Sequence, residues 1–378
     1  MRRFRRELLE SGRNKNESGS WADPTFNPIT MRNGAFRAML VLLCWTAAAP
    51  AWAADCRVDR GDGSGLILRL GPNCTDQERS AHAVQARNIA MAIKEGKAID
   101  LSGVVVTGDL TFDDLPLGPF PTELGGEVSD SGGTARTVPV ALSIVDSFVK
   151  GSVRHDAGKE FLVMRGALTL SGTTFEQPLD LSRTVFVEPV TLSGAVFLRE
   201  SYFVNARFLR GLFAEKTAFG PHTRFHRARF RGAATFQRSG FNGLAEFLEV
   251  QFERDADFSR TYFKSGTGFS GSRFHGLVDF SEAQFAREAF FTFTEFDGDA
   301  SFERATFRSV ADFDDVQFHR RDDFSKALFE GEARFARVKR PVNGPPAVGL
   351  ENAQVQYGIT LSLLVFSALL IAYLIRTR

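Results

Sequence analysis

A phenylalanine at nearly every fifth or sixth position is the feature that most constrains the fold of this chain. From Phe197 to Phe335 the intervals between successive Phe residues alternate between five and six, and only around Phe213 is the order shuffled and then recovered. The chain holds 38 Phe against 4 Tyr and 3 Trp, a bias that an ordinary core does not need. Because neither a helical period of 3.6 nor a simple period of two fits across these intervals, the pattern predicts a repeat of short units.

The residue two positions before nearly every Phe is small or β-branched, as Val278 is before Phe280. A spacing of two places both side chains on one side of an extended backbone. Each unit is therefore expected to be one short extended segment followed by a turn, with one large and one small residue pointing inward. Asp322, two residues before Phe324, is the one clear violation in this stretch.

The unit resembles the repeat of the pentapeptide-repeat proteins, commonly written Ala-(Asp/Asn)-Leu-x-x with a central Leu or Phe. The matching segments include Ala256-Asp257-Phe258-Ser259, Val278-Asp279-Phe280-Ser281 and Ala311-Asp312-Phe313-Asp314. The resemblance covers Leu170 to Phe335 and implies the fold of that family, an all-β solenoid in the form of a right-handed quadrilateral β-helix. The chain departs from the family pattern by one additional residue in alternate units, which lengthens a coil of four units to 22 residues.

A 22-residue coil predicts which side chains stack on one another. Phe258, Phe280, Phe302 and Phe324 should form one ladder. Hydrogen-bonded coils lie about 4.8 Å apart, a distance at which offset aromatic rings attract by about 0.5–1.5 kcal/mol per pair beyond burial. Since one coil cannot bury its own Phe side chains, stability should be cooperative between coils, and the ends should need caps.

Thr75 and Glu78 form a capping-box pattern at the start of a predicted helix. Apolar residues follow at helical spacing until Gly96 stops the pattern, so the N-terminal part is expected to be a cap with a helix. The expected organisation of the chain is a polar extension at 1–30, a signal peptide at 31–53, the cap at 54–98, the β-helix at 99–336 with a Pro- and Gly-rich loop insertion at 116–137, a linker at 337–357, a transmembrane helix at 358–375 and a tail at 376–378.

The segment after Met31 matches a secretory signal. Two Arg residues, the apolar stretch Ala38 to Ala49 and the small-residue site Ala51-Trp52-Ala53 follow one another. The preceding extension leaves two alternatives, either that Met31 is the true start or that the charged region of the signal is unusually long.

The apolar segment from Gly358 to Ile375 predicts a transmembrane helix. It is uncharged and about long enough to cross a hydrocarbon core of about 30 Å at 1.5 Å per residue. Arg376 and Arg378 are expected to stay cytoplasmic by the positive-inside tendency. The prediction is a single-pass membrane protein whose main domain is extracytoplasmic, in the periplasm or at the cell surface.

Two cysteines remain in the exported chain, because Cys44 would leave with the signal. Cys56 and Cys74 can pair in an oxidising compartment, which would stabilise the fold by about 3 kcal/mol. The alternative is a pair of free thiols.

The sequence contains no pattern typical of a catalytic or cofactor site. It has no Ser/His/Asp arrangement, no Gly-rich phosphate loop and no Cys/His cluster with zinc spacing. We therefore expect neither enzymatic activity nor a cofactor. His222 and His226 are close in sequence, but they are expected at different corners of the solenoid, as solvated surface and not as metal ligands.

The net charge is only +1, so a binding surface has to come from local clustering. Residues 197–240 hold nine basic and two acidic residues, whereas 241–335 hold 11 basic and 19 acidic residues, which predicts a rod that is bipolar along its axis. The residue before each Phe should point outward, and the acids at these positions gather on two opposite faces, which hold Glu246, Asp257, Asp279, Asp312 and Asp323, whereas the other two faces supply only Glu295 over the same region. Asp257, Asp279 and Asp323 are weak candidates for divalent-cation ligands, and the alternative is that they only maintain solubility.

These observations favour a non-enzymatic, membrane-anchored binding or scaffold protein with a protein partner on its β-helix faces and no nucleic acid. A DNA mimic that binds a topoisomerase, a role known in the family that the chain resembles, would need a cytoplasmic and broadly acidic rod. The targeting signals and the basic segment oppose it. A third hypothesis is a carbohydrate-active β-helix enzyme, for which only residues 116–137 could supply a groove.

Overall fold

The computed structural model describes residues 56–341 except 128–132, 157 and 159. The predicted signal peptide at 31–53 and the predicted transmembrane helix at 358–375 lie outside the described residues. Within the described part of the chain, no helix is both long enough and apolar enough to span a membrane.

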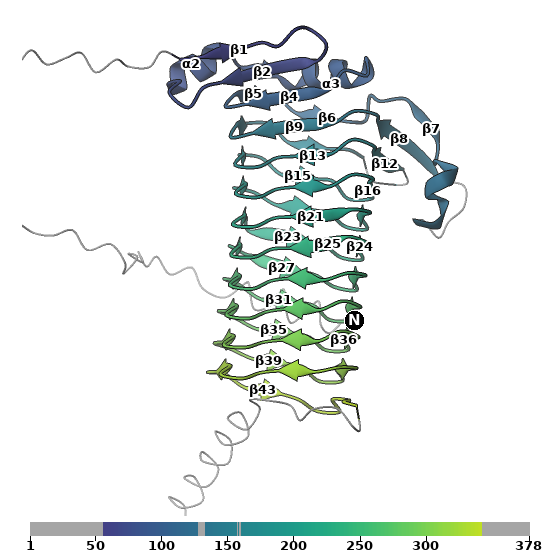
Figure 1. Cartoon of the computed structure of the whole chain (residues 1–378), viewed down its shortest axis with the longest axis vertical. Coiled ribbons are helices and arrows are strands. Elements are labelled where there is room, and N and C mark those ends of the chain that lie inside the picture. The colour runs from purple at the N-terminus through teal and green to yellow at the C-terminus, as the bar shows by residue number, and fades with distance from the viewer. Residues whose placement is uncertain (1–55, 128–132, 157, 159, 342–378) are drawn as a thin grey trace, which may run out of the picture. The chain divides into compact units, whose positions relative to one another are not determined.

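Short strands wind into a solenoid of about 11 turns with four sides, each side being one sheet that runs along the rod (Figure 1). We name the sides A to D in the order in which the chain visits them. This confirms the predicted all-β solenoid. All neighbouring strands are parallel except β1 with β2 and β7 with β8.

Side A contains β1 (Val58–Asp59), β2 (Leu66–Leu70), β4 (Ile99–Ser102), β9 (Leu142–Val145), β13 (Leu168–Thr169), β17 (Val190–Thr191), β21 (Gly211–Phe213), β25 (Ala233–Thr235), β29 (Ala256–Asp257), β33 (Val278–Asp279), β37 (Ala300–Ser301) and β41 (Asp322–Asp323). Side B contains β3 (Val84–Gln85), β5 (Val105–Thr107), β10 (Phe148–Val149), β14 (Thr174–Phe175), β18 (Val196–Phe197), β22 (Ala218–Phe219), β26 (Gly240–Phe241), β30 (Tyr262–Phe263), β34 (Gln284–Phe285), β38 (Thr306–Phe307) and β42 (Leu328–Phe329).

Side C contains β6 (Leu110–Thr111), β11 (Val153–Arg154), β15 (Leu179–Asp180), β19 (Ser201–Tyr202), β23 (His222–Arg224), β27 (Leu244–Glu246), β31 (Thr267–Gly268), β35 (Ala289–Phe290), β39 (Ala311–Asp312) and β43 (Ala333–Arg334). Side D contains β7 (Leu117–Pro119), β8 (Thr134–Val138), β12 (Phe161–Met164), β16 (Thr184–Phe186), β20 (Arg207–Phe208), β24 (Arg229–Phe230), β28 (Gln251–Phe252), β32 (Arg273–Phe274), β36 (Glu295–Phe296) and β40 (Gln317–Phe318).

The register between coils follows the predicted 22-residue spacing from β13 onward. Leu168 pairs with Val190, and Ser301 pairs with Asp323. Ladders of Phe rings fill the interior: Phe280 stacks on Phe258 at 4.9 Å and on Phe302 at 5.1 Å, and it meets Phe269 of the next ladder edge-on at 5.2 Å. Stacking within ladders and edge contacts between them are the arrangements that aromatic rings prefer, so the core is held by one repeated geometry.

Phe213 is an exception to the predicted interior lattice, because its side chain is 37% exposed. Leu212 and Ala214 on either side of it are fully buried, and Ala214 takes the ladder position between Leu192 and Phe236. Alternate residues of a strand point to opposite faces, so Phe213 has to point outward when its neighbours point inward. The expectation that Phe213 belongs to the ladder was wrong.

The predicted N-terminal helix is divided into two. The capping box of Thr75 and Glu78 is present and begins α2 (Asp76–Ala81). The apolar residues Ile89 and Ile93 belong to a second helix, α3 (Ala86–Lys94), and their side chains are buried. Between the two helices lies β3, which pairs with β5 on side B. The helical pattern is interrupted because residues 84–85 form their backbone contacts with the sheet.

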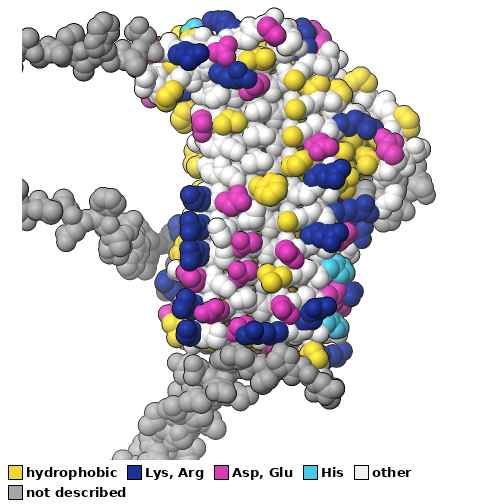
Figure 2. All heavy atoms as spheres, viewed as in Figure 1, with side chains coloured by type: hydrophobic (Ala, Val, Ile, Leu, Met, Phe, Trp, Pro, Cys, Tyr) yellow, Lys and Arg dark blue, Asp and Glu magenta, His cyan; other side chains and the backbone are white. Residues whose placement is uncertain are grey.

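Of residues 116–137, predicted as a loop insertion, the described parts 116–127 and 133–137 form an arm that projects from the rod (Figure 1). The arm consists of the antiparallel hairpin β7–β8 and the 3₁₀ helix η1 (Thr122–Glu127), and β8 also pairs with β12 on side D. Leu124 of the arm packs in a second apolar cluster with Phe161 and Val185 on the outer surface of side D. Hydrophobic side chains are visible where the arm meets the rod (Figure 2).

Asp322, the residue that violated the inward pattern, is buried at the C-terminal end of side A with 2% exposure. Its Oδ2 accepts hydrogen bonds from Arg340 at 2.8 and 2.9 Å. Arg340 also lies over the ring of Phe318 at 5.3 Å. An inward carboxylate is tolerated here because side A ends at β41, and Arg340 covers the end of the interior.

Candidate functional site

The five acids that were predicted to point outward lie on two non-adjacent sides of the rod, and Asp312 differs from the other four because it is buried, with 9% exposure. Asp257, Asp279 and Asp323 are on side A, and Glu246 and Asp312 are on side C. Because coils stack in sequence order, the basic segment 197–240 and the acidic segment 241–335 occupy successive parts of the rod.

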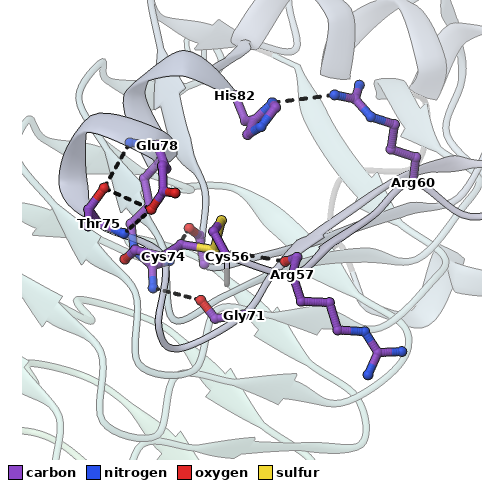
Figure 3. The surroundings of a disulfide bond; sticks show 10 residues. Cys56, Arg57, Arg60, Gly71, Cys74, Thr75, Glu78 and His82 are labelled. Carbon is purple, nitrogen blue, oxygen red and sulfur yellow. Dashed lines mark hydrogen bonds between the residues drawn. A yellow bond between two sulfur atoms is a disulfide. The ribbon is translucent and has the colours of Figure 1, made fainter. Parts of the chain in front are cut away.

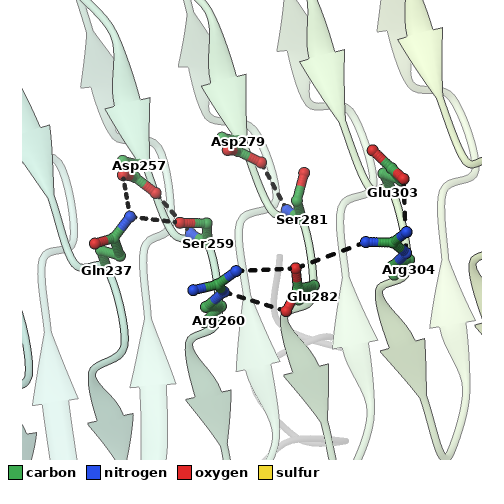
Figure 4. A network of polar contacts seen from close by, with 9 residues as sticks. All are labelled: Gln237, Asp257, Ser259, Arg260, Asp279, Ser281, Glu282, Glu303 and Arg304. Atoms are coloured by element: carbon green, nitrogen blue, oxygen red, sulfur yellow. Dashed lines mark hydrogen bonds and ion pairs between the residues drawn. The ribbon is translucent and has the colours of Figure 1, made fainter.

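Asp257 and Asp279 are direct partners across neighbouring coils, whereas Ser301 separates Asp279 from Asp323. One oxygen of each carboxylate accepts a hydrogen bond from the serine amide two residues later, at 2.8 Å for Asp257 and 2.7 Å for Asp279 (Figure 4). This side-chain-to-backbone bond is a common way of fixing a turn. These acids therefore hold the corners of the coils, and divalent-cation binding by Asp257, Asp279 and Asp323 stays a prediction.

A column of charged residues follows the corner between sides A and B. Glu282 accepts from Arg260 at 3.1 Å and lies 4.0 Å from Arg304 (Figure 4). The three residues are 22 apart and each has a positive φ, so the repeated corner displays one side chain per coil. Exposed ion pairs of this kind contribute about 0–1 kcal/mol each, so they order the surface more than they stabilise the fold.

His222 pairs with Glu246 on side C and not with a metal-binding partner from its own turn. Its Nε2 lies 3.1 Å from Glu246 Oε2, which also accepts from Arg224 at 2.6 Å. Burial acts to raise the pKa of Glu246, but the hydrogen bond from His222 and the charge of Arg224 outweigh it and lower the pKa below its ordinary value. This ion-pair cluster keeps Glu246 charged.

A second His-carboxylate cluster, on side D, was missed at the sequence level. Among the described residues, Glu295, Asp297 and His319 are a group whose potential metal-binding atoms lie within 4.8 Å of one another. His275 Nδ1 is 2.7 Å from Asp297 Oδ2, and Arg273 Nε donates to the same oxygen at 2.9 Å. The spacing of 22 that relates His275, Asp297 and His319 was the available signal.

Arg273 occupies the carboxylate oxygens that a metal ion would need in this cluster. Burial would raise the pKa of Asp297, but the hydrogen bond and charge of Arg273 outweigh it and hold the pKa below its ordinary value. Arg273 also lies 3.2 Å from Glu295. Because a cation would have to displace this guanidinium from both carboxylates, the cluster functions as an ion-pair network.

Cys56 and Cys74 are joined by a disulfide with an S–S distance of 2.05 Å (Figure 3). The bond connects the segment that leads into β1 with the turn before α2, where the Cys74 amide donates to the Gly71 carbonyl at 3.2 Å. It closes a separation of 18 residues at the N-terminal end of the rod.

The comparison with known families gives one match. A family model described as pentapeptide repeats (9 copies) matches residues 294–339. No curated protein and no solved structure matches the chain significantly. The matched residues lie in the C-terminal coils, which share their register with all coils back to β13.

Proposed function

We propose that this chain, whose C-terminal coils match the pentapeptide-repeat model over residues 294–339, is a non-enzymatic binding or scaffold module, anchored in a membrane, that presents its solenoid to a protein partner on the extracytoplasmic side. The observation that carries the proposal is the ordered outer surface. Turn-forming acids and ion-pair columns display side chains at one position per coil, about 4.8 Å apart, over a rigid aromatic core. Such a surface suits recognition of an extended partner.

The disulfide between Cys56 and Cys74 supports the extracytoplasmic location, because disulfides form and persist mainly in oxidising compartments. The signal-like segment at 31–53 and the apolar segment at 358–375 support export and anchoring. In this proposal residues 376–378 remain in the cytoplasm.

The proposal includes a cap at the N-terminal end. Strands β1 and β2 and helix α3 lie beyond the first coils, and α3 buries Ile89 and Ile93 against the core. A solenoid needs such a cover because its terminal coil otherwise exposes apolar side chains and unpaired backbone groups.

Topology is tested with a reporter that is active only in the cytoplasm. Fused after Gly240 it should be silent, and fused after Arg378 it should be active. Activity after Gly240 would refute export of the rod.

For the binding role, a photo-crosslinking residue at Tyr262, which is exposed on side B, should capture a defined protein in intact cells, and the same residue at buried Phe263 should not. Equal or absent capture at both positions would count against a partner on this side.

A further inference from the structure

A groove follows side D next to the arm. It has a volume of about 610 Å³, within the range of ligand-binding sites, and Gly126 of the arm contributes to its lining. The rest of the lining comes from five successive coils. Each of these coils contributes one residue of its side D strand, from Arg207 in the first coil to Glu295 in the fifth, and one residue of the corner before that strand, from Asn205 to Phe293. Four coil intervals of about 4.8 Å make a groove about 19 Å long. Lys and Arg side chains lie along the rod below the arm (Figure 2).

The groove combines cationic and anionic groups. Four Arg and two Glu line it. Arg227 donates to Glu249 at 2.7 Å, and Arg229 donates to Gln251 at 2.9 Å, so the guanidinium groups are held in defined positions. Guanidinium groups bind carboxylates in a bidentate manner, whereas the Glu carboxylates can accept hydrogen bonds from ligand hydroxyl groups. The matching ligand carries both carboxylates and hydroxyls.

Phe293 adds an exposed apolar surface to this polar groove. Its side chain is 65% exposed, and its φ is +59°, in the left-handed region that a bulky residue rarely adopts. The coil imposes this conformation at every corner, but the preceding residues of the column are Asn205, Arg227, Glu249 and Gly271. Because the same corner holds polar residues or Gly in the preceding coils, the fold does not require an exposed Phe at this position. Its flat ring can pack against the apolar face of a sugar ring.

The fold disfavours other extended ligands. Each of the groove strands from β20 to β36 is hydrogen-bonded to a neighbouring strand on both sides, so a peptide cannot add to the sheet as a further strand. Glu249 and Glu295 in the lining repel duplex DNA, which carries about one charge per 1.7 Å, more strongly than a single chain with one carboxylate on each ring. A chain with more widely spaced charges and many hydroxyl groups fits both conditions.

We propose that this groove binds an oligosaccharide that carries carboxylate groups, with Arg227 and Arg229 contacting its acids and Phe293 packing on one of its rings. The inference rests on the proposed binding role and identifies a ligand class for one side of the rod. It involves no bond cleavage.

The test is calorimetric titration of the full-length protein with two defined probes, a galacturonic acid hexamer and a mannuronic acid hexamer. At least one should bind saturably, with an affinity that falls as salt is raised, because the contacts are charged. The fully methyl-esterified hexamer should bind at least tenfold more weakly, and a Glu hexapeptide should bind no better than the ester.

Variants locate the binding. Arg227→Gln with Arg229→Gln should weaken binding at least tenfold, whereas Arg260→Gln, in the ion-pair column on another corner, should leave it unchanged. Phe293→Asn should weaken binding at least fivefold while the melting temperature stays the same or rises, because Asn tolerates a positive φ. A purely structural Phe293 would lower the melting temperature instead. Phe213→Ala is the control for an exposed Phe outside the groove.

The groove assignment is overturned if neither acidic hexamer binds, if the ester or the Glu peptide binds equally well, or if Arg260→Gln weakens binding as much as the groove variants do. These failures would leave the proposed function intact when crosslinking at Tyr262 still captures a protein partner. Failure of that crosslinking with intact hexamer binding would contradict the protein-scaffold role alone.

Discussion

Replacing Phe280 by Ala should destabilise the solenoid strongly. Phe280 is fully buried, with rings of its own ladder 4.9 and 5.1 Å away on either side and edge contacts to Phe269 and Phe291. Truncation of a buried Phe to Ala costs about 3–5 kcal/mol through lost transfer energy and the cavity that remains. Each stacked pair that is lost adds to this through about 0.5–1.5 kcal/mol of aromatic attraction.

The upper half of that range is expected, because the cavity cannot close. The coils on both sides are held by backbone hydrogen bonds of 2.7 Å, from Phe258 to Asp279 and from Phe280 to Ser301. Neighbouring coils therefore cannot move together to fill the space, since that would break the ladders of all four sides.

Equilibrium unfolding in urea, followed by far-ultraviolet circular dichroism, measures the effect. Phe213→Ala is the matched control, because the exposed Phe213 should change the free energy of unfolding by no more than about 0.5 kcal/mol. A lower m value or a second transition in Phe280→Ala would show that the array unfolds locally beside the cavity. A cooperative transition with a loss below about 1 kcal/mol would refute the assigned packing.

Four further predictions concern charges and the N-terminal end. Arg340→Met should cost about 3–5 kcal/mol in urea unfolding, because it leaves Asp322 buried without its cation, and adding Asp322→Val should restore most of the loss; an unchanged single variant would contradict the end-closing role. Burial raises the pKa of Asp312 above the value of 3.8 that it has in the unfolded chain, so its ionised carboxylate destabilises the fold at neutral pH, whereas the protonated form below pH 3.8 does not. Asp312→Asn should therefore raise the melting temperature at pH 7 but not at pH 3, and equal effects at both pH values would contradict the raised pKa. Reduction of the Cys56–Cys74 disulfide should lower stability by about 3 kcal/mol, with hydrogen exchange increasing first in β1 and α2; uniform exchange along the rod would argue against a local tether. If the acids of side A bind cations, titration with Ca²⁺ or Mg²⁺ at low salt should give saturable heat that disappears in the Asp257→Asn, Asp279→Asn double variant, and unchanged heat would exclude this pair.

The repeat spacing predicted the 22-residue coil and the ladder of Phe258, Phe280, Phe302 and Phe324, and the family resemblance of the repeat unit implied the solenoid; the structure contains all three. These features could be predicted from the sequence because they depend on two local rules. Side chains two residues apart share one face of an extended backbone, and equal coil lengths place identical positions above one another. The capping box at Thr75 was accessible for the same reason, since its contacts span three residues.

Only the tertiary structure decided the features that depend on contacts between distant segments. The burial of Asp322 requires Arg340 to return over the end of the rod. The place of Phe213 outside the core depends on the backbone phase that the neighbouring coils impose. The described part of the arm packs on the outer surface of side D, where it contacts Phe161 and Val185. The groove beside it exists because Phe293 and four Arg residues from three other coils line one side of the rod. Composition and spacing are properties of one segment at a time. The arrangements above depend on contacts between coils that are tens of residues apart in the chain and become neighbours only when the chain folds.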